Sequence, residues 1–413
     1  MNIFVVNSGS SSIKYQLFKM PCEKPICSGL VERIGLEGSI ITHKVFLNGA
    51  ETVIKKTVDL PNHAAGLLAV TSLLTDSEKG VIQNPEDINV VGHRVVHGGE
   101  TFAATTVITA EVKEEIQKLF PLAPLHNPAN LKGIEVAEKI FSKAIQVAVF
   151  DTAFHQTIPD VAFRYAIPQS FYTDLRIRAY GFHGTSHKYV SEQAIAHLQN
   201  PEAKIITIHL GNGCSMAAVN AGKSIDTSMG FGPLSGLIMG TRSGDIDPSV
   251  IFHLVDEVGY DLEKVKTLLN KQSGMQGLTG FSDMRDIIKA IGEGNSEAKL
   301  SYEMYAYRIK KYIGSYAAVL NGLDAIVFTA GVGENDANIR SLVCTNMNYL
   351  GIRLNEELNN QRGSGIREIS TSDSTVKVLV VPTNEELEIA QQCHDLLTIK
   401  PEKEYLGSGQ LGH

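Results

Sequence analysis

The chain has 413 residues, more than one ordinary hydrophobic core can organise, so we expect two domains with a cleft between them. It carries 37 Lys and Arg against 45 Asp and Glu and contains no long basic run, which argues against nucleic acid as a partner. Its five cysteines form no C-x-x-C pair, and no apolar run approaches the roughly 18 residues of a membrane helix, so we expect a reduced, cytoplasmic protein without membrane spans.

The first predicted element is a hairpin. Residues 3–6 form a short apolar strand, residues 7–12 form a turn of sequence NSGSSS, and residues 13–18 form the returning strand. The glycine permits close backbone approach, while amides, hydroxyls and the point charge of Lys14 can face one anion. A serine-rich hairpin tip without function would show the same residues, so this turn alone leaves both interpretations open.

Residues 93–99, of sequence HRVVHGG, follow a second predicted strand at residues 89–91. Strand alternation places Arg94 and Val96 on the same side. Arg94 can then bind a carboxylate while Val96 contacts its alkyl part, although an arginine at a strand end commonly makes only a surface salt bridge.

Asp151 ends the next apolar strand, residues 146–150. Active-site carboxylates commonly occupy this position in open α/β sheets, although a turn-initiating aspartate explains it equally. Further along, His183 lies between two glycines in residues 180–184, where it can donate a hydrogen bond to a developing anionic charge.

Two H-x-x-x-H pairs, His93/His97 and His183/His187, suggest a zinc site. On a strand this spacing leaves the two rings too far apart to share one ion, and neither pair carries the glutamate of H-E-x-x-H. A zinc hydrolase is therefore only a minor alternative.

A second hairpin repeats the first about half a chain later, with a strand at residues 205–209, a turn at 210–213 and a returning strand at 215–219. The repetition suggests two related domains, each offering a loop to the cleft. A third apolar strand, residues 325–329, enters a turn at 331–335 and then a helix. The glycines of this turn can let a nucleotide lie against the backbone, or they can be needed only for the backbone geometry of a strand-to-helix turn. Short apolar strands alternating with amphipathic segments indicate an α/β fold.

Arg242 stands between two glycines in residues 240–245, which suits a guanidinium that meets a phosphoryl group at close range. Between Arg242 and the third strand, the apolar spacing predicts two long packing helices, one over residues 248–271 and one over residues 297–320.

Thr383 and Glu386 have the spacing of a capping box at a helix start, which leaves Glu385 free to reach Mg²⁺ directly or through water. Two nucleotide-binding signatures are rejected. The G-x-G-x-x-G at residues 407–412 has no helix after it, and the Gly-Lys-Ser at residues 222–224 lacks the first glycine of a Walker A loop.

Taken together, these motifs resemble the signature of the acetate kinase family, in order from Asn2 to about Leu397. They are NSGSSSIK (7–14), HRVVHGG (93–99), FDTAFH (150–155), GFHG (181–184), HLGNG (209–213), MGTR (239–242) and GVGEN (331–335). The resemblance implies the α/β fold shared by acetate and sugar kinases, Hsp70 and actin, with duplicated ribonuclease H-like domains and an interdomain active-site cleft. It also implies a homodimer.

The resemblance also suggests domain boundaries. We expect residues 1–151 plus 386–400 to form an N-terminal domain that is completed by a C-terminal helix. Residues 152–385 form the second domain, which carries most of the nucleotide site, and residues 401–413 form a polar tail.

Individual roles follow from the resemblance. Asn7 and Glu385 match the positions associated with Mg²⁺, for which Mn²⁺ can substitute, and Lys14 matches a phosphate contact. Arg94 and Arg242 match the arginines around the carboxylate and the moving phosphoryl group. His183 matches a histidine that stabilises the transition state, and Asp151 matches the catalytic aspartate. The ATP-binding positions are matched by His209, Leu210, Gly211, Asn212, Gly213, Asp283, Met284, Arg285, Gly331, Val332, Gly333, Glu334 and Asn335.

The pocket for the substrate's methyl group is matched by Val96, Leu125, Phe182 and Pro233. The chain departs from the family pattern beside this pocket, because Gly232 and Ser235 stand where the family commonly has Thr and Glu. The departure bears on pocket size and leaves the catalytic positions unaffected.

The implied activity is that of an acetate kinase: reversible, Mg²⁺-dependent transfer of the γ-phosphate of ATP to acetate, giving acetyl phosphate and ADP. A carboxylate is ionised at neutral pH and needs no strong base, which favours direct in-line transfer with Asp151 orienting an arginine or Mg²⁺-bound water. Two alternatives stay open. One is a propionate or butyrate kinase, against which Val96 weighs; the other is an actin- or Hsp70-type ATPase, against which Arg94 and Arg242 weigh.

Overall fold

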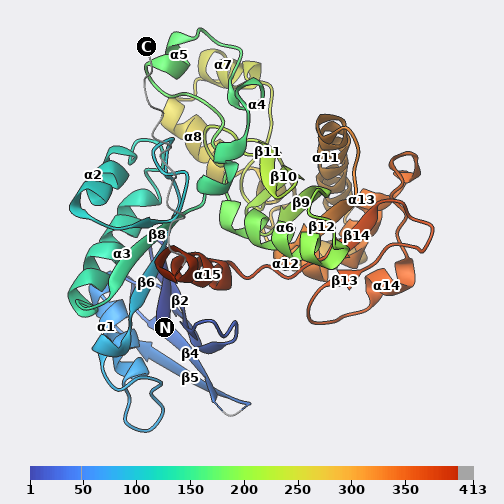
Figure 1. Cartoon of the computed structure of the whole chain (residues 1–413). Helices are drawn as coiled ribbons and strands as arrows, with labels where there is room; N and C mark the ends of the chain where they lie inside the picture. The colour runs from blue at the N-terminus through green and yellow to red at the C-terminus, as the bar shows by residue number, and fades with distance from the viewer. Residues whose placement is uncertain (48, 399–413) are drawn as a thin grey trace, which may run out of the picture.

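Two mixed β-sheets organise the chain in the computed structural model, which describes residues 1–47 and 49–398 (Figure 1). The first sheet has eight strands in the order β5-β4-β3-β2-β1-β6-β8-β7. Its strands are β1 (Asn2–Ser8), β2 (Ser12–Lys19), β3 (Pro25–Glu32), β4 (Ser39–Leu47), β5 (Ala50–Val58), β6 (Val90–Val95), β7 (Thr106–Val107) and β8 (Ile145–Phe150).

The second sheet has six strands in the order β11-β10-β9-β12-β14-β13. Its strands are β9 (Lys204–Leu210), β10 (Cys214–Asn220), β11 (Lys223–Thr227), β12 (Ala325–Thr329), β13 (Arg367–Glu368) and β14 (Lys377–Val380). In each sheet an antiparallel hairpin, β1–β2 or β9–β10, is extended by two strands parallel to its first strand, β6 and β8 or β12 and β14. This confirms the α/β class and the two related hairpins.

Helices surround both sheets. They are α1 (His63–Leu74), α2 (Ala110–Lys118), α3 (Asn127–Ile140), α4 (Asp160–Phe163), α5 (Ser170–Thr173), α6 (Gly184–Leu198), α7 (Ser249–Asp256), α8 (Leu262–Lys271), α9 (Gly274–Thr279), α10 (Met284–Gly292), α11 (Ser296–Leu320), α12 (Ala330–Asn335), α13 (Ala337–Cys344), α14 (Glu356–Asn360) and α15 (Glu385–Thr398). Short 3₁₀ turns are η1 (Pro85–Asp87), η2 (Ala153–Thr157) and η3 (Asn348–Leu350). Within the described residues, none of these helices combines the length and apolarity that a membrane span requires.

The two faces of the first sheet are covered by helices from opposite ends of the chain. Alternating side chains of the central strands point to α1 and α3 on one face, where Phe4 and Tyr15 are buried. On the other face Ile3 and Val5 pack against Leu387 of α15. The last helix therefore belongs to the core of the first sheet, and it also lies against α6, which covers the second sheet (Figure 1).

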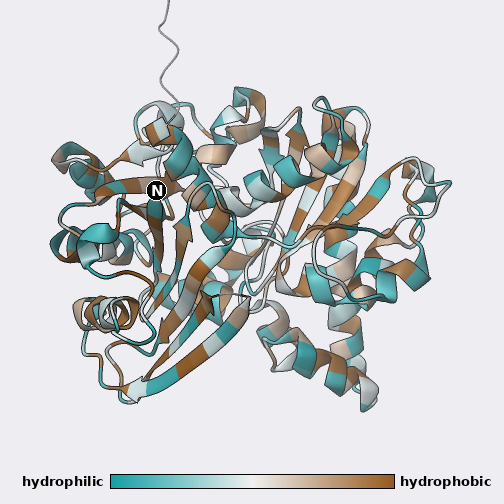
Figure 2. Cartoon of the chain, turned by 60° about the horizontal axis from the view of Figure 1, so that its bottom comes forward, coloured by the Kyte–Doolittle hydropathy of each residue, from teal (hydrophilic) through white to brown (hydrophobic). Residues whose placement is uncertain are grey.

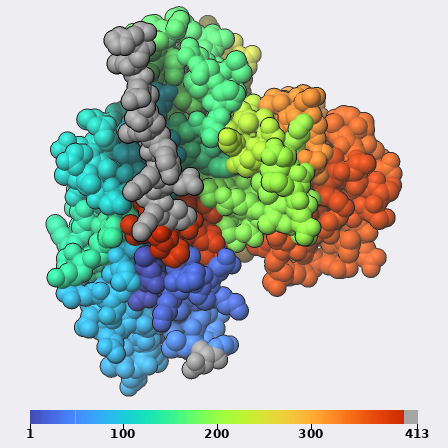
Figure 3. All heavy atoms as spheres, viewed as in Figure 1, coloured from blue at the N-terminus to red at the C-terminus, as the bar shows by residue number. Residues whose placement is uncertain are grey.

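The apolar residues follow this layering. Figure 2 shows hydrophobic residues concentrated along the strands and on the helix sides that face them. In Figure 3 the segments of the first sheet, coloured blue to cyan, and those of the second, coloured green to orange, form two lobes, with α15 in red between them. The site residues predicted from both hairpins therefore come from two lobes that meet near α15.

The two long helices predicted from apolar spacing had different outcomes. Residues 297–320 form most of α11, with Ile309 and Ile313 fully buried, so this prediction is confirmed. The prediction of one helix over residues 248–271 is wrong, because the chain breaks between α7 and α8. Gly259 adopts φ of 76°, and the side chain of Asp261 then caps α8 by accepting a hydrogen bond from the Lys264 amide.

Candidate active site

The first hairpin meets the start of α15. Lys14 on β2 forms an ion pair with Glu386, with Nζ and Oε1 2.7 Å apart, and Glu386 is nearly buried. The predicted capping box is wrong, since the Asn384 side chain, and not Thr383, accepts the hydrogen bond from the Leu387 amide. Asn384 takes the capping role, and Glu386 is the partner of Lys14.

Arg94 lies on β6, and neighbouring side chains contact its guanidinium on several sides. Its Nε donates to Asp151 Oδ1 at 3.0 Å and its Nη2 to Asp151 Oδ2, a bidentate pair. Asn7 Oδ1 lies 3.5 Å from Nη1, and the Glu385 carboxylate lies 3.7 Å from Nε. Burial alone would lower the pKa of the Arg94 guanidinium, but Asp151 and Glu385 together raise it above the usual value.

Asp151 is 1 % exposed, and both of its oxygens are engaged. Besides Arg94, it accepts a hydrogen bond of 3.3 Å from the Thr185 hydroxyl at the start of α6. Its backbone carbonyl accepts the Gly184 amide at 2.9 Å, so close that a Cβ on Gly184 would lie 2.1 Å from that oxygen. Asp151 thus holds both the Arg94 side chain and the first turn of α6 in place.

Asn7 and Glu385, the residues predicted to hold Mg²⁺, both contact Arg94 and therefore lie near each other. Burial raises the pKa of the Glu385 carboxyl, while Arg94 lowers it. The two supply only oxygen ligands, which suit Mg²⁺, but they would leave most of its coordination to water and phosphate. Among the residues that the structure describes, no cluster of three or more His, Cys, Asp or Glu forms a cation cage. The metal assignment stays a prediction.

His183 sits just before α6, in a left-handed conformation with φ of 57°. Its Nδ1 lies 2.9 Å from the Ser215 hydroxyl, and its ring stacks on His209 with centroids 4.4 Å apart. Burial lowers the pKa of His183 well below its usual value, as do His209 and His187. These effects favour the neutral ring.

His183 and His187 do not lie on a strand, as the metal argument assumed for their spacing. His187 is in the first turn of α6, and its Nε2 lies 2.7 Å from the same Ser215 hydroxyl that His183 contacts. Both rings contact the same hydroxyl group.

Arg242 comes from the second lobe. Its Nη1 donates to the Pro233 carbonyl at 2.9 Å, and burial lowers the pKa of the guanidinium. Within residues 1–47 and 49–398, no carboxylate lies within ion-pair distance of it. A Cβ on Gly213 would lie 3.3 Å from His183 and 3.8 Å from Arg242, so the second hairpin loop touches both. A partly buried cation without a carboxylate is suited to an anionic ligand.

The four residues predicted for the methyl pocket differ in burial. Val96 and Phe182 belong to one buried apolar cluster, whereas Leu125 is 61 % exposed and Pro233 is partly buried. His126, next to Leu125, is close enough to Arg94 and Arg242 that their charges add to the lowering of its pKa by burial. That loop therefore reaches the two arginines.

Gly232 and Ser235, where the resemblance leads us to expect Thr and Glu, lie beside Pro233. A Cβ at Gly232 would meet no atom within 4 Å, so its small size is not required by packing. The Ser235 hydroxyl accepts a hydrogen bond from the Gly230 amide at 3.0 Å and closes this loop locally.

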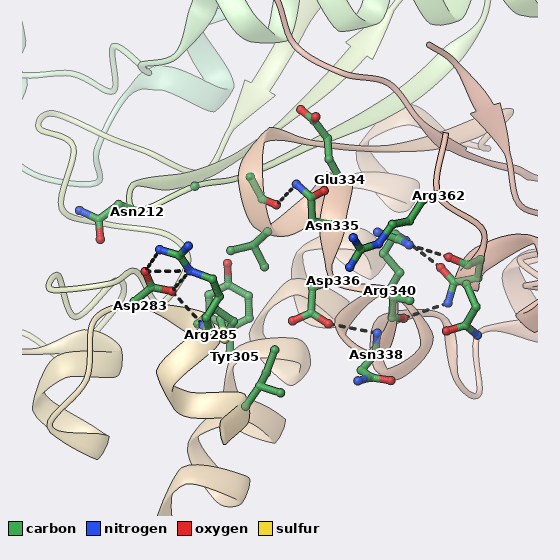
Figure 4. Close-up of a pocket in the computed structure, with 18 of the residues that line it drawn as sticks. Asn212, Asp283, Arg285, Tyr305, Glu334, Asn335, Asp336, Asn338, Arg340 and Arg362 are labelled. Carbon is green, nitrogen blue, oxygen red and sulfur yellow. Dashed lines mark hydrogen bonds and ion pairs between the residues drawn. The ribbon is translucent and has the colours of Figure 1, made fainter. Parts of the chain in front are cut away.

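A cavity of about 1010 Å³ opens beside the second hairpin, large enough for a nucleotide (Figure 4). It brings together parts of all three segments predicted to bind ATP, which are far apart in the sequence. The predicted residues that line it are Gly211, Asn212, Asp283, Met284, Arg285, Gly331, Val332, Glu334 and Asn335. The other predicted residues, His209, Leu210, Gly213 and Gly333, are not part of this lining.

The predicted turn at residues 331–335 is already helical, as part of α12, and Ala330 before it has a φ of 64°. The chain thus turns sharply from β12 into a helix at the cavity wall, where the strain of a left-handed alanine is typical of functional loops. The Asn335 side chain donates to the Gly331 carbonyl at 2.8 Å and holds this turn.

Arg340 lines the cavity but was not predicted. Its guanidinium is buried and donates to the side chain and backbone of Asn359 and to the Gly333 carbonyl, at 2.7 to 2.9 Å. Figure 4 shows it with Arg362 on the side opposite Asp283 and Arg285. The sequence does not mark Arg340 as a site residue, because a single arginine within a predicted helix is usually a solvated surface residue.

The chain is similar to known proteins over nearly its whole length. Residues 2–391 match the model of the acetokinase family. An acetate kinase of Flavobacterium johnsoniae is 60 % identical over 397 residues, which cover 96 % of this chain and all of that protein. The crystal structure of Porphyromonas gingivalis acetate kinase superposes with a TM-score of 0.90 at 46 % identity, covering 96 % of this chain and 99 % of that one.

A propionate kinase from Francisella tularensis is also similar in structure, with a TM-score of 0.88 and 42 % identity, covering 95 % of this chain and 98 % of that chain. The matches span nearly the whole length on both sides, so they include both sheets and every segment of the site described above. The chain belongs to the acetokinase family.

Proposed function

We propose that the protein is an acetate kinase that transfers the γ-phosphoryl group of ATP reversibly to acetate, giving acetyl phosphate and ADP. One observation carries the proposal: Arg94 and Arg242 both lie close enough to the half-buried His183 for their charges to lower its pKa, and the loop that His183 and Arg242 contact also lines a cavity of nucleotide size. Arg94 is fixed by Asp151, while Arg242 lacks a carboxylate partner among the described residues. This arrangement suits two anions that must be brought together.

In the proposed reaction a carboxylate oxygen of acetate forms a bond to the γ-phosphorus as the bond to the bridging β–γ oxygen breaks. Arg94 orients the carboxylate, and Arg242 and His183 face the charge on the moving phosphoryl group. Asp151 holds Arg94 by two hydrogen bonds and removes no proton, because the acceptor is already ionised. Lys14 reaches a phosphate of the nucleotide.

Mg²⁺, or Mn²⁺ in its place, would be held by Asn7 and Glu385 and would neutralise phosphate charge when bound. Their oxygen ligands and their closeness to Arg94 support this assignment. A Glu385→Gln variant should need more Mg²⁺ to reach half-maximal rate, and unchanged Mg²⁺ dependence would contradict the assignment.

The central test is direct. The protein is incubated with Mg·ATP, hydroxylamine and acetate, propionate or butyrate in turn, and the trapped hydroxamate is measured. We expect hydroxamate with acetate at the highest kcat/KM, and no hydroxamate with any acid would defeat the proposal. An ATPase of the actin or Hsp70 type would hydrolyse ATP at the same rate without an acid. Inversion at a chiral γ-phosphate would support direct transfer, and retention would contradict it.

Val96 is the residue on which we base the preference for acetate over a longer acid. It is 8 % exposed and packs with Phe182 in one apolar cluster. One methylene in such a pocket is worth about 1 to 3 kcal/mol of discrimination. Val96→Ala should therefore raise kcat/KM for propionate relative to acetate, and an unchanged ratio would remove Val96 from the pocket.

We also propose a cytoplasmic homodimer. The support for a dimer is a group of exposed apolar side chains on or beside α4, α5 and α7, which Figure 1 draws at the same end of the molecule: Val161, Phe171, Leu175, Val250 and Phe252. Sedimentation should give twice the chain mass of 44.8 kDa. Phe252→Asp should shift it to the monomer, and Val53→Asp on β5 is the matched control. A monomeric parent protein would contradict the proposal.

The proposed domain division is residues 1–151 plus 386–400 and residues 152–385. Its support is the packing of α15 on the first sheet. Limited proteolysis should cut between residues 152 and 183 or near residue 382 before it cuts within either sheet.

A further inference from the structure

Two neighbouring strands of the first sheet, β1 and β6, separate where the site begins. They run parallel, and their pairing ends with Val6 opposite His93. In a parallel pair the carbonyl of one residue bonds to the amide one residue beyond its partner, so a continued ladder would join the Ser8 carbonyl to the Val96 amide. Instead, the side-chain amide of Asn130 lies between these two groups.

Asn130 joins both strand ends through one amide group. Its Oδ1 accepts a hydrogen bond from the Val96 amide at 3.1 Å, and its Nδ2 donates to the Ser8 carbonyl at 2.9 Å. These partners fix the orientation of the side chain, because a backbone amide can only donate and a carbonyl can only accept. Asn130 is 3 % exposed, so water does not compete for either bond. The side chain therefore holds the two strand ends one amide group apart.

The helix that carries Asn130 lies directly against the end of β1. Gly133 is one turn further along α3, and a Cβ on Gly133 would lie 2.3 Å from Ser8 Oγ. The contact leaves no room for α3 to move closer to Ser8, because protein interiors are close-packed. Asn130 is thus held on a helix whose distance from β1 is already fixed.

The turn after β1 has supports of its own. A backbone hydrogen bond of 2.9 Å from the Gly9 amide closes the turn, and His63 Nε2 at the start of α1 lies 2.6 Å from the Gly9 carbonyl. Between the carboxyl ends of β1 and β6, the described part of the chain shows one direct side-chain hydrogen bond, the long 3.5 Å contact of Asn7 Oδ1 with Arg94 Nη1. The turn can therefore keep its shape while Asn130 sets its position relative to β6.

A second buried asparagine on the same helix provides a contrast. Asn127 accepts a hydrogen bond from the His97 amide at 3.1 Å and donates to the His97 carbonyl at 2.9 Å. These are the same two kinds of bond, at the same lengths, as those of Asn130, but both go to one residue. They support the chain after β6 and do not join it to β1.

We propose that Asn130 is a positioning residue that sets the distance between the two halves of the site. The end of β1 carries Asn7, the proposed Mg²⁺ contact. The end of β6 carries Arg94 and leads to Val96, the proposed contacts of the acid. Direct transfer needs the acid oxygen and the phosphorus in line at a set separation, so an error in this distance lowers the rate. The inference rests on the proposed function for its catalytic meaning, while the link itself is present in the free protein.

The first experiment compares Asn130→Ala with Asn127→Ala in the full-length protein. Each variant loses one donor and one acceptor from a buried side chain and leaves one backbone amide and one carbonyl unpaired, so their urea midpoints should fall by similar amounts. At saturating Mg·ATP and acetate, Asn130→Ala should lower kcat in the hydroxamate assay by about 10- to 100-fold, since a displacement of about 1 Å can cost about 10²-fold, and Asn127→Ala by less than about threefold. Equal losses of kcat would overturn the proposal, because they would leave Asn130 with a stabilising role alone.

Hydrogen–deuterium exchange of the free protein reads the link without any activity. Asn130→Ala should speed exchange in peptides that cover residues 7–14 as well as in those that cover residues 94–99, whereas Asn127→Ala should speed it in residues 94–99 alone. Unchanged exchange at residues 7–14 in Asn130→Ala would overturn the proposal. If the parent protein makes no hydroxamate, the proposed function fails, while the exchange result still decides whether Asn130 holds the two strand ends.

Gly133→Ala tests the same spacing without removing a hydrogen-bonding group, and it decides the question if Asn130→Ala does not fold. Alanine favours a helix, but its Cβ would lie 2.3 Å from Ser8 Oγ and 2.8 Å from Ser8 Cβ, so the end of β1 must shift away from α3. We expect faster exchange at residues 7–14 and a kcat lower by about tenfold or more. Parental exchange and parental kcat in folded Gly133→Ala would overturn the proposal.

Discussion

The two lobes prepare the same site by different means. On the first lobe, charged groups are held by ion pairs: Arg94 by Asp151, and Lys14 by Glu386. On the second lobe, next to Arg242, the side chains are neutral imidazoles and hydroxyls that fix one another by hydrogen bonds. The first arrangement supplies charge in a set direction, and the second supplies dipoles without adding charge to a buried place.

The difference matters because a buried charge and a buried dipole fail in different ways. When a partner of a buried charge is removed, the charge left behind destabilises the fold. When a neutral donor is lost, the fold can keep its stability while the electrostatic environment of the reaction changes. Variants in the two lobes should therefore separate stability from catalysis.

The largest effect is expected from Arg94→Ala. It leaves the Asp151 carboxylate, 1 % exposed, without its cation, and breaking such a pair typically costs about 3 to 5 kcal/mol of unfolding free energy. Activity should be lost as well. Urea unfolding measures the first effect and the hydroxamate assay the second. Replacement of both partners, as Arg94→Met with Asp151→Leu, should recover much of the unfolding free energy. If Arg94→Ala does not lower the unfolding free energy, the proposed difference between the two lobes is wrong.

Arg242→Ala should act on catalysis alone. No carboxylate is left unpaired by the change, so the urea midpoint should stay near that of the parent protein. The loss of a charged donor should lower kcat by about 10²- to 10³-fold, or about 2.7 to 4 kcal/mol of transition-state stabilisation. Arg242→Lys tests whether a positive charge is enough for catalysis without the planar guanidinium and its paired hydrogen-bond donors. A small change in kcat with intact folding would refute the role of Arg242.

Acid should destabilise the protein through its buried histidines. Burial lowers the pKa of His155 and His209 to about 4, below the roughly 6.5 of an unfolded chain. Between these values the unfolded state binds more protons, so the unfolding free energy falls as the pH falls from about 6.5 to 4, and it levels off above 7.

Urea midpoints at several pH values measure this loss. His155→Gln removes one such group and should reduce the slope by about 1.4 kcal/mol per pH unit. An identical slope in parent and variant would show that His155 is not held neutral by the fold.

The smallest effect is expected at Gly232. A Cβ there would meet no atom within 4 Å, so Gly232→Thr, the residue that the resemblance leads us to expect, should change stability by less than about 0.5 kcal/mol. Gly184→Ala is the contrasting variant, because its Cβ would lie 2.1 Å from the Asp151 carbonyl where the two lobes join. Gly184→Ala should unfold at a much lower urea concentration than Gly232→Thr. Equal urea midpoints for the two variants would contradict the close packing of Gly184 on the Asp151 carbonyl.

Local patterns in the sequence were enough for the hairpins, for Asp151 after its strand and for the glycine segment after β12, because each lies within a few residues of its own signal. The same locality explains the errors. Apolar spacing runs on through residues 248–271, but Gly259 turns the chain, and the spacing of Thr383 and Glu386 fits a cap that Asn384 in fact provides.

Other site residues could not be predicted because nothing near them in the sequence marks them. Ser215 and Thr207 read as ordinary strand residues, and only the pairing of β9 with β10 and the packing of α6 bring them to His187. Arg340 reads as a surface arginine, yet it is buried against Asn359. Long-range pairing, and not residue type, creates these contacts.

The position of α15 has a consequence for how the protein is made. One face of the first sheet, with Ile3, Val5 and Val90, is covered by a helix that ends at Thr398. A ribosome releases β8 long before it releases α15, and at roughly 5–20 residues per second the delay is about 10 to 50 seconds. During that time the nascent chain carries a completed sheet with an uncovered apolar face, so its yield in cells should depend on chaperones that protect such surfaces until synthesis ends.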